Sequence, residues 1–140
     1  MQRLETTAYG FRLALSGAVT LDELSELKQA LQRALERLSP GFGALVDLRR
    51  LAPLSAEASE RMIELQRLCR AAGLVRSAVV LDSALVATQF SRLAALARIR
   101  QGERHLDAGR HPDWERAAER WVVAAEEPVA PVPLPAPRSR

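Results

Sequence analysis

Two adjacent arginines, Arg49 and Arg50, are the one local concentration of positive charge in the sequence, and they follow an aspartate, Asp47. Guanidinium groups bind phosphates and carboxylates through paired hydrogen bonds, so these arginines suit an anion or the acidic side chains of a partner protein. A solvated loop is the other interpretation. Ser55 lies a few residues further on, where we expect it to cap a helix; phosphorylation with support from the helix dipole is the alternative.

A second polar pair, Asp82 and Ser83, follows an apolar run at 77–81. Both residue types accept hydrogen bonds from the free backbone N–H groups at the start of a helix, so we expect them to cap one. In open α/β sheets, ligands lie beyond the carboxyl ends of the strands, near helix amino termini. The candidate residues for binding a partner or an anion at that edge are therefore Asp47, Arg49, Arg50, Ser55, Asp82 and Ser83.

The sequence lacks the residue patterns that zinc binding, nucleophilic catalysis and phosphate-binding loops require. His105 and His111 are the only histidines, and neither has a cysteine or carboxylate at an established zinc spacing. Ser83 lacks the flanking glycines of a nucleophile elbow, and no glycine-rich phosphate loop is present. The sequence therefore predicts no metal, no cofactor and no enzyme activity.

Composition limits the partners and the compartment. The net charge is +3, but the basic residues are spread along the chain and interleaved with acidic ones. Without a basic stripe or aromatic residues placed to stack on bases, we expect no nucleic-acid binding. No apolar run is long enough for membrane insertion and no leader pattern is present, so we expect a cytoplasmic protein. The single Cys69 is predicted to be a buried thiol in a reducing compartment.

The elements that would position these residues follow from the hydrophobic pattern. The run at 77–81 is apolar at nearly every position, which is typical of a strand covered by helices on both faces of a mainly parallel sheet. Thr20 and Glu23 form a capping box that opens a helix. The predicted order is strand, strand, helix, strand, helix, strand, helix, short strand, helix.

The predicted fold class is therefore α/β, with a single mixed, mainly parallel sheet and four helices. We expect one domain over residues 1–124. Residues 125–140 are rich in proline and cannot form a core, so they are predicted to be a disordered tail. A repeat protein built of helices is the competing fold, but the apolar strands at 42–46 and 77–81 count against it.

This order resembles the STAS (SpoIIAA-like) family. The residues that carry the resemblance are Ala44 to Asp47, Ser77 to Ser83, Asp113 to Glu115, and Trp121. The resemblance extends to anti-sigma-factor antagonists and to the lipid-binding CRAL-TRIO (Sec14-like) domains. It implies SpoIIAA-like topology and a small module that works by binding.

The resemblance is incomplete at one functional position. Antagonists that are switched by phosphorylation carry a serine and a glycine directly after the strand-ending aspartate, whereas Leu48, Arg49 and Arg50 follow Asp47 here. We therefore expect a protein-interaction module of STAS type without that serine, which binds a regulatory protein or a second copy of itself. The alternative is a carrier for a lipid or another small apolar ligand, as the Sec14-like relatives imply.

Overall fold

The computed structural model describes residues 1–97 and 101–128, so most of the predicted tail lies outside the described part of the chain. The predicted element order is confirmed. The nine elements are β1 (Gln2–Thr6), β2 (Gly10–Gly17), α1 (Leu21–Glu36), β3 (Gly43–Leu51), α2 (Ala56–Ala71), β4 (Arg76–Leu81), α3 (Ala84–Ala97), β5 (Glu103–Asp107) and α4 (Trp114–Ala124).

The strands form one sheet in the order β1-β2-β3-β4-β5, which is also their order along the chain. β1 runs antiparallel to β2, and every later pair is parallel. The prediction of a single mixed, mainly parallel sheet is therefore confirmed. Because parallel strands all end at the same side, the polar segments after β3 and β4 come to one edge of the sheet.

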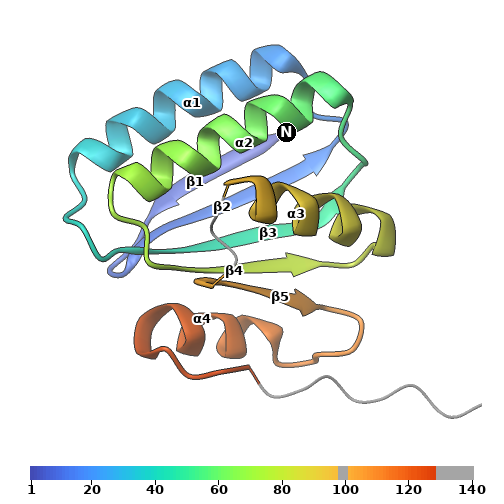
Figure 1. The fold of residues 1–140 in the computed structure, drawn as a ribbon. Helices are drawn as coiled ribbons and strands as arrows, with labels where there is room; N and C mark the ends of the chain where they lie inside the picture. The colour runs from blue at the N-terminus through green and yellow to red at the C-terminus, as the bar shows by residue number, and fades with distance from the viewer. Residues whose placement is uncertain (98–100, 129–140) are drawn as a thin grey trace, which may run out of the picture.

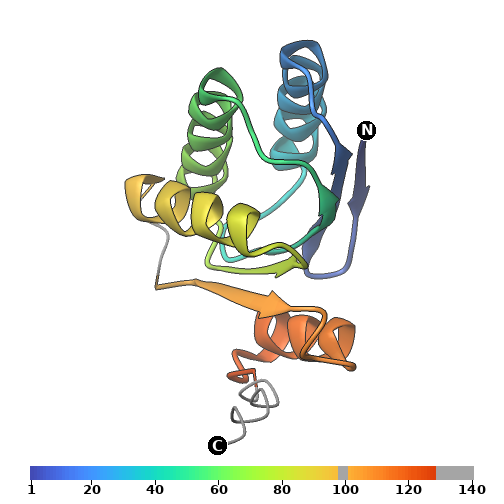
Figure 2. The same cartoon turned by 90° about the vertical axis from the view of Figure 1, so that its right-hand side faces the viewer.

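The helices are divided unequally between the two faces of the sheet. α1, α2 and α3 cover one face, and α4, the only described helix on the other face, packs on β3, β4 and β5 (Figures 1 and 2). The larger core lies under the three helices and includes Leu15, Leu27 and Phe90, which are at most 2% exposed. The smaller core, under α4, consists of Leu45, Ala78, Val80, Leu106, Ala118, Trp121 and Val122.

Local signals place the helix starts where the sequence predicts them. The Thr20 side chain accepts a hydrogen bond from the Glu23 backbone N–H at 3.1 Å, and the Glu23 carboxylate accepts one from the Thr20 N–H. Ser55 caps α2 by accepting from the N–H of Ala58 at 3.1 Å. These bonds satisfy backbone donors that have no partner within the helix, so the predicted capping by both residues is confirmed.

One strand is longer than predicted. The sequence ends it near Asp47, where charged residues begin, but β3 continues to Leu51. Its register against β2 moves from Ala14 opposite Asp47 to Ser16 opposite Arg50, so β3 contains one extra residue. This is a β-bulge, which keeps a strand paired while changing the direction of its side chains. Asp47, Arg49 and Arg50 therefore lie on a bulged strand and not on a loop.

Candidate functional site

In the part of the chain that the structure describes, the face of the sheet that carries α4 is covered mainly over β3, β4 and β5. Beyond the helix, over β1 and β2, polar and charged side chains replace the apolar ones of the core. Together with Ala14, the residues Arg3, Glu5, Arg12 and Asp47 line a shallow hollow of about 280 Å³. An uncovered, polar half of a sheet face is a surface that a partner can reach.

The bulge in β3 explains how Asp47 and Arg49 are held together. The Oδ1 atom of Asp47 accepts a hydrogen bond from the Arg49 backbone N–H at 3.2 Å. The two carboxylate oxygens also accept from Nε and Nη2 of Arg49, both at 2.9 Å. One carboxylate thus serves a backbone donor beside the bulge and fixes the guanidinium in a forked pair.

Two residues of α4 complete this arrangement. The Arg49 guanidinium lies over the Trp114 ring, 4.4 Å from its centroid, in the range of a cation–π contact. Arg12 donates from Nη1 to the Glu115 carboxylate at 2.6 Å and lies 6.0 Å from the same ring. We call these five residues, Arg12, Asp47, Arg49, Trp114 and Glu115, the Arg–Trp cluster. It joins β2, β3 and α4 on the open face.

The charges in the cluster stabilise one another. Burial by itself raises the pKa of Asp47, but the hydrogen bonds and the positive charge of Arg49 outweigh it, and the net pKa is lowered. The hydrogen bond to Asp47 raises the pKa of Arg49 in turn. At neutral pH both groups are charged, so the Arg49 guanidinium is held in a fixed position although its side chain is 39% exposed.

The structure separates the other predicted residues into two groups. Arg50 is exposed on β3 next to the cluster, and Asp82 is exposed directly after β4, where its charge acts on Arg49. Ser55 and Ser83 serve as caps, since Ser83 Oγ accepts from the Val86 N–H at 3.4 Å. Among the described residues, no hydrogen bond or ion pair joins either serine to the cluster.

Three members of the cluster, Arg12, Trp114 and Glu115, were not among the predicted site residues. Arg12 and Glu115 are 103 positions apart in the chain, and no local pattern announces their contact. A weak signal was present for Trp114 and Glu115, because they belong to the Asp113 to Glu115 segment that carries the resemblance. For Arg12 the only signal is its position on the polar side of an alternating strand.

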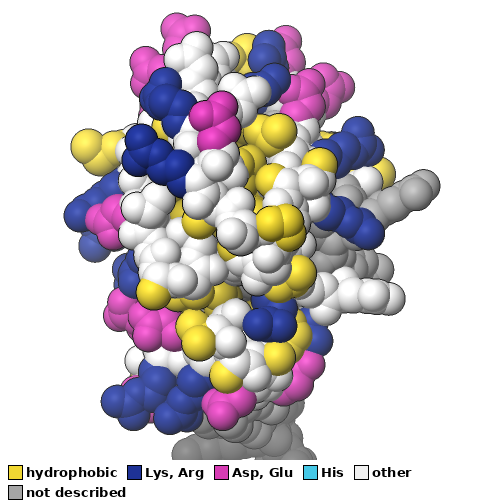
Figure 3. All heavy atoms as spheres, turned by 90° about the vertical axis from the view of Figure 1, so that its left-hand side faces the viewer, with side chains coloured by type: hydrophobic (Ala, Val, Ile, Leu, Met, Phe, Trp, Pro, Cys, Tyr) yellow, Lys and Arg dark blue, Asp and Glu magenta, His cyan; other side chains and the backbone are white. Residues whose placement is uncertain are grey.

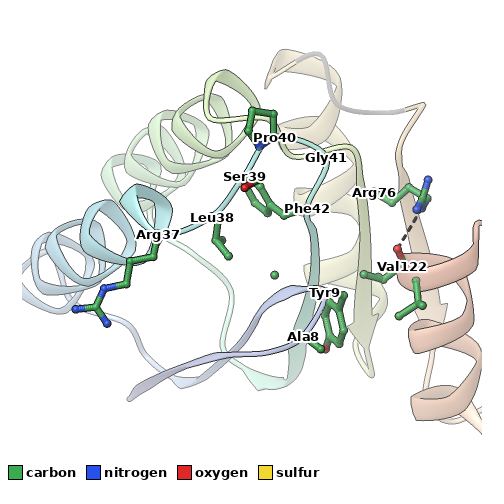
Figure 4. A pocket seen from close by; sticks show the side chains of 12 residues that line it. Ala8, Tyr9, Arg37, Leu38, Ser39, Pro40, Gly41, Phe42, Arg76 and Val122 are labelled. Carbon is green, nitrogen blue, oxygen red and sulfur yellow. Dashed lines mark hydrogen bonds between the residues drawn. The ribbon is translucent and has the colours of Figure 1, made fainter.

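A separate groove lies at the other end of the strands, where the parallel strands begin. It measures about 510 Å³, with Tyr9 at its side and Arg76 and Val122 on its far wall, where Arg76 Nε donates to the Val122 carbonyl at 3.2 Å (Figure 4). Positive and negative side chains are interspersed with small apolar spots at this end of the molecule (Figure 3). The groove is open to solvent and contains none of the predicted site residues.

An apolar cavity of about 60 Å³ lies between the sheet and the three helices, next to Met62, Leu65 and Phe90. Pockets that hold small-molecule ligands are usually about 300–1,000 Å³. The cavity is therefore too small for a lipid chain and does not support the carrier hypothesis. Cys69 lines it and is 5% exposed, as predicted for a buried thiol, and burial raises its pKa to about 12.

The described residues offer neither a metal-binding cluster nor a membrane-spanning helix. Within residues 1–97 and 101–128, no group of three or more His, Cys, Asp and Glu side chains is placed to hold a metal ion. In the same part of the chain, no helix has both the length and the apolar character needed to cross a membrane.

The mixed sheet with three helices on one face and one on the other is the SpoIIAA-like fold. The chain is similar to an uncharacterized protein from the DUF3478 family with a SpoIIAA-like fold from Shewanella loihica: the TM-score is 0.63 and the identity 18%, over 87% of this chain and 92% of that one. It is also similar to an anti-sigma factor antagonist from Mycobacterium paratuberculosis: the TM-score is 0.52 and the identity 16%, over 85% and 93% of the two chains. No family model and no curated protein matches the sequence.

Proposed function

We propose that this chain is a non-enzymatic protein-interaction module that binds a regulatory protein through the Arg–Trp cluster and the adjacent Arg50. The observation that carries the proposal is the fixed guanidinium of Arg49, held by Asp47 on one side and by Trp114 on the other. Arginine and tryptophan, together with tyrosine, are enriched among the residues that contribute most of the binding energy at protein interfaces. A guanidinium that is already fixed loses little conformational entropy when a partner binds.

The chemistry of the partner follows from the exposed charges. Arg50 is exposed and makes no ion pair with any residue that the structure describes. Arg49 uses Nε and Nη2 for Asp47, which leaves Nη1 as a further donor. Carboxylates on the partner would accept from both arginines, so we infer that the docking surface of the partner is acidic at this point.

The fold likeness to an anti-sigma factor antagonist supports a regulatory partner, but the regulation would differ from a phosphorylation switch after the strand-ending aspartate. That position is occupied here by Leu48, which is 1% exposed and packs in the larger core. It offers no hydroxyl and no access to a kinase. Control by a kinase at this position is therefore not part of the proposal.

The test is native mass spectrometry of the protein purified gently from its own cells, followed by denaturing analysis of what it releases. We expect a protein companion in fixed ratio that is lost from the Arg49→Glu, Arg50→Glu double variant. Arg61→Glu, at an exposed arginine on α2, is the matched control and should keep the companion. Retention by the double variant would exclude this surface. Release of a lipid or metabolite, and no protein, would favour the carrier.

A further inference from the structure

β1 lies at one edge of the sheet, and the direction of its backbone groups can be derived from its pairing with β2 (Figure 1). Thr7 and Gly10 exchange both backbone hydrogen bonds, at 2.9 and 3.3 Å, and the Ser16 N–H donates to the Met1 carbonyl at 2.9 Å. In an antiparallel ladder such hydrogen-bonded pairs alternate along the strand. The odd-numbered residues therefore bond to β2, while the N–H and C=O groups of Gln2, Leu4 and Thr6 point outward.

The side chains of β1 carry opposite charges at equal distances from Leu4. Arg3 and Glu5 lie on the open face of the sheet and pair with each other at 2.6 Å. If a second β1 lies antiparallel with Leu4 opposite Leu4, each Arg3 faces Glu5 of the other copy. The Leu4 and Gln2–Thr6 pairs then make the backbone hydrogen bonds, and the charged pairs occupy the sites where side chains approach most closely.

α1 repeats this pattern beside the same edge. A groove of about 290 Å³ between α1 and β1 is lined by Leu4, Thr6, Ala30, Arg33, Ala34 and Arg37. On this stripe of the helix the charges are acidic before Ala30, at Glu23 and Glu26, and basic after it, at Arg33 and Arg37. Two-fold symmetry would direct the acidic end of each α1 toward the basic end of the other.

The centres of the two charge patterns, Leu4 on β1 and Ala30 on α1, also lie at the same distance along the edge of the sheet. The amino group of Met1 contacts the Glu23 carboxylate at 2.8 Å, which fixes a common starting point for strand and helix. Leu4 is three strand residues further, about 10 Å, and Ala30 is seven helix residues further, also about 10 Å. One two-fold axis can therefore pass beside both Leu4 and Ala30.

The other edge of the sheet has no such symmetry. Pairing β5 antiparallel with a second β5 around its central residue, His105, would place Glu103 opposite Asp107 of the other copy. Like charges directly opposite each other are destabilising. Charged residues on an edge strand normally prevent pairing with other chains. On β1, however, the opposite charges of Arg3 and Glu5 disfavour registers that place like charges opposite each other and favour the antiparallel register with Leu4 opposite Leu4.

We propose that two copies of this chain form a symmetric dimer by antiparallel pairing of their β1 strands around Leu4. The dimer contains one continuous sheet, with both Arg–Trp clusters on the same face. The proposal does not depend on what the clusters bind, since β1 and α1 contribute no residue to them.

The test is sedimentation of the full chain, without an added amino-terminal tag, over a dilution series. The wild-type chain should show a monomer–dimer equilibrium. Arg3→Glu or Glu5→Arg alone should raise the dissociation constant at least about tenfold, because two attractive pairs become repulsive. An equimolar mixture of those two variants should restore dimers, and so should the double exchange Arg3→Glu with Glu5→Arg in one chain.

Leu4→Pro provides a second test that involves no charge. It removes an outward N–H that β2 does not use, and proline is tolerated at such positions of edge strands. We expect a folded monomer by circular dichroism and sedimentation. A wild-type chain that stays monomeric throughout the series would overturn the proposal. So would a dimer that neither Leu4→Pro nor the single charge exchanges weaken.

Discussion

The two tryptophans of α4 each contact an arginine side chain, but they differ in burial and in what they hold in place. Trp121 is 5% exposed and its Nε1 donates to the carbonyls of Ser77 and Gly102 at 3.0 and 3.2 Å, with Arg104 4.0 Å above the ring. Trp114 is only half-buried and lies under Arg49 on the open face. One ring fixes the helix on the sheet, and the other fixes an arginine that solvent can reach. A single short helix therefore combines one end that is buried in the core with another that presents a fixed arginine to solvent.

Replacing the buried ring should have the largest effect. Trp121→Ala would leave a cavity in the smaller core and remove two hydrogen bonds to backbone carbonyls. We expect a loss of about 3–5 kcal/mol in the free energy of unfolding, measured by urea denaturation. A loss below about 1 kcal/mol would contradict the role of Trp121 as the anchor of α4.

Adding a side chain at Gly43, where α4 packs on the sheet, should have the next largest effect. A Cβ at Gly43 would overlap Val122 Cγ1 and would lie 3.2 Å from the Arg76 carbonyl oxygen. Because valine is stiff at χ1, Gly43→Ala should cost about 1–3 kcal/mol of unfolding free energy. Adding Val122→Ala should recover part of that loss in a double-mutant cycle. Strictly additive effects would show that the two residues are not coupled.

Replacing the exposed ring should separate stability from binding. Trp114→Ala removes the surface under the Arg49 guanidinium but little of the core, so we expect a stability loss of about 1 kcal/mol. Retention of the protein companion in native mass spectrometry should nevertheless fall as it does in the Arg49→Glu, Arg50→Glu variant. A stability loss as large as that of Trp121→Ala would abolish the distinction between the two rings.

The smallest effects should come from the acidic partners of the two arginines. The pKa of Asp47 is lower in the folded state, so its charged form favours folding; this contribution is present above about pH 4 and is lost as the pH falls through the folded-state pKa. The stability difference between wild type and Asp47→Asn should therefore shrink on acidification. Glu127→Gln, at the exposed partner of Arg104, should show a smaller difference at neutral pH.

The sequence predicted the order of the elements because each apolar run is ended by turn or capping residues. Thr20 and Ser55 mark their helices without any knowledge of the rest of the chain. The predicted end of β3 was wrong for a physical reason. Charged residues normally end a strand, but here the pairing of Arg50 and Leu51 with Ser16 and Gly17 of β2 extends β3 beyond them. A local pattern contains no information about a partner strand thirty or more residues away.

The candidate site was predicted in part for the same reason. Asp47 and Arg49 are two residues apart, so the sequence could place them together. Arg12 joins them through the pairing of β2 with β3, and Trp114 joins them through the packing of α4 on the sheet, which depends on the smaller core as a whole. Contacts within one element are readable from spacing, whereas contacts between distant elements require the fold.

The order of the strands in the sheet has a consequence for how the chain acquires its structure. Every strand after β1 pairs with the strand that precedes it in the chain. During synthesis, each new strand therefore meets an edge that already exists, and no strand has to insert between two others. Among the elements that the structure describes, α4 is synthesised last, so Leu45 and Val80 on its face of the sheet remain exposed until the residues of α4 have been made. Of the two described cores, the smaller one under α4 is thus the later to close.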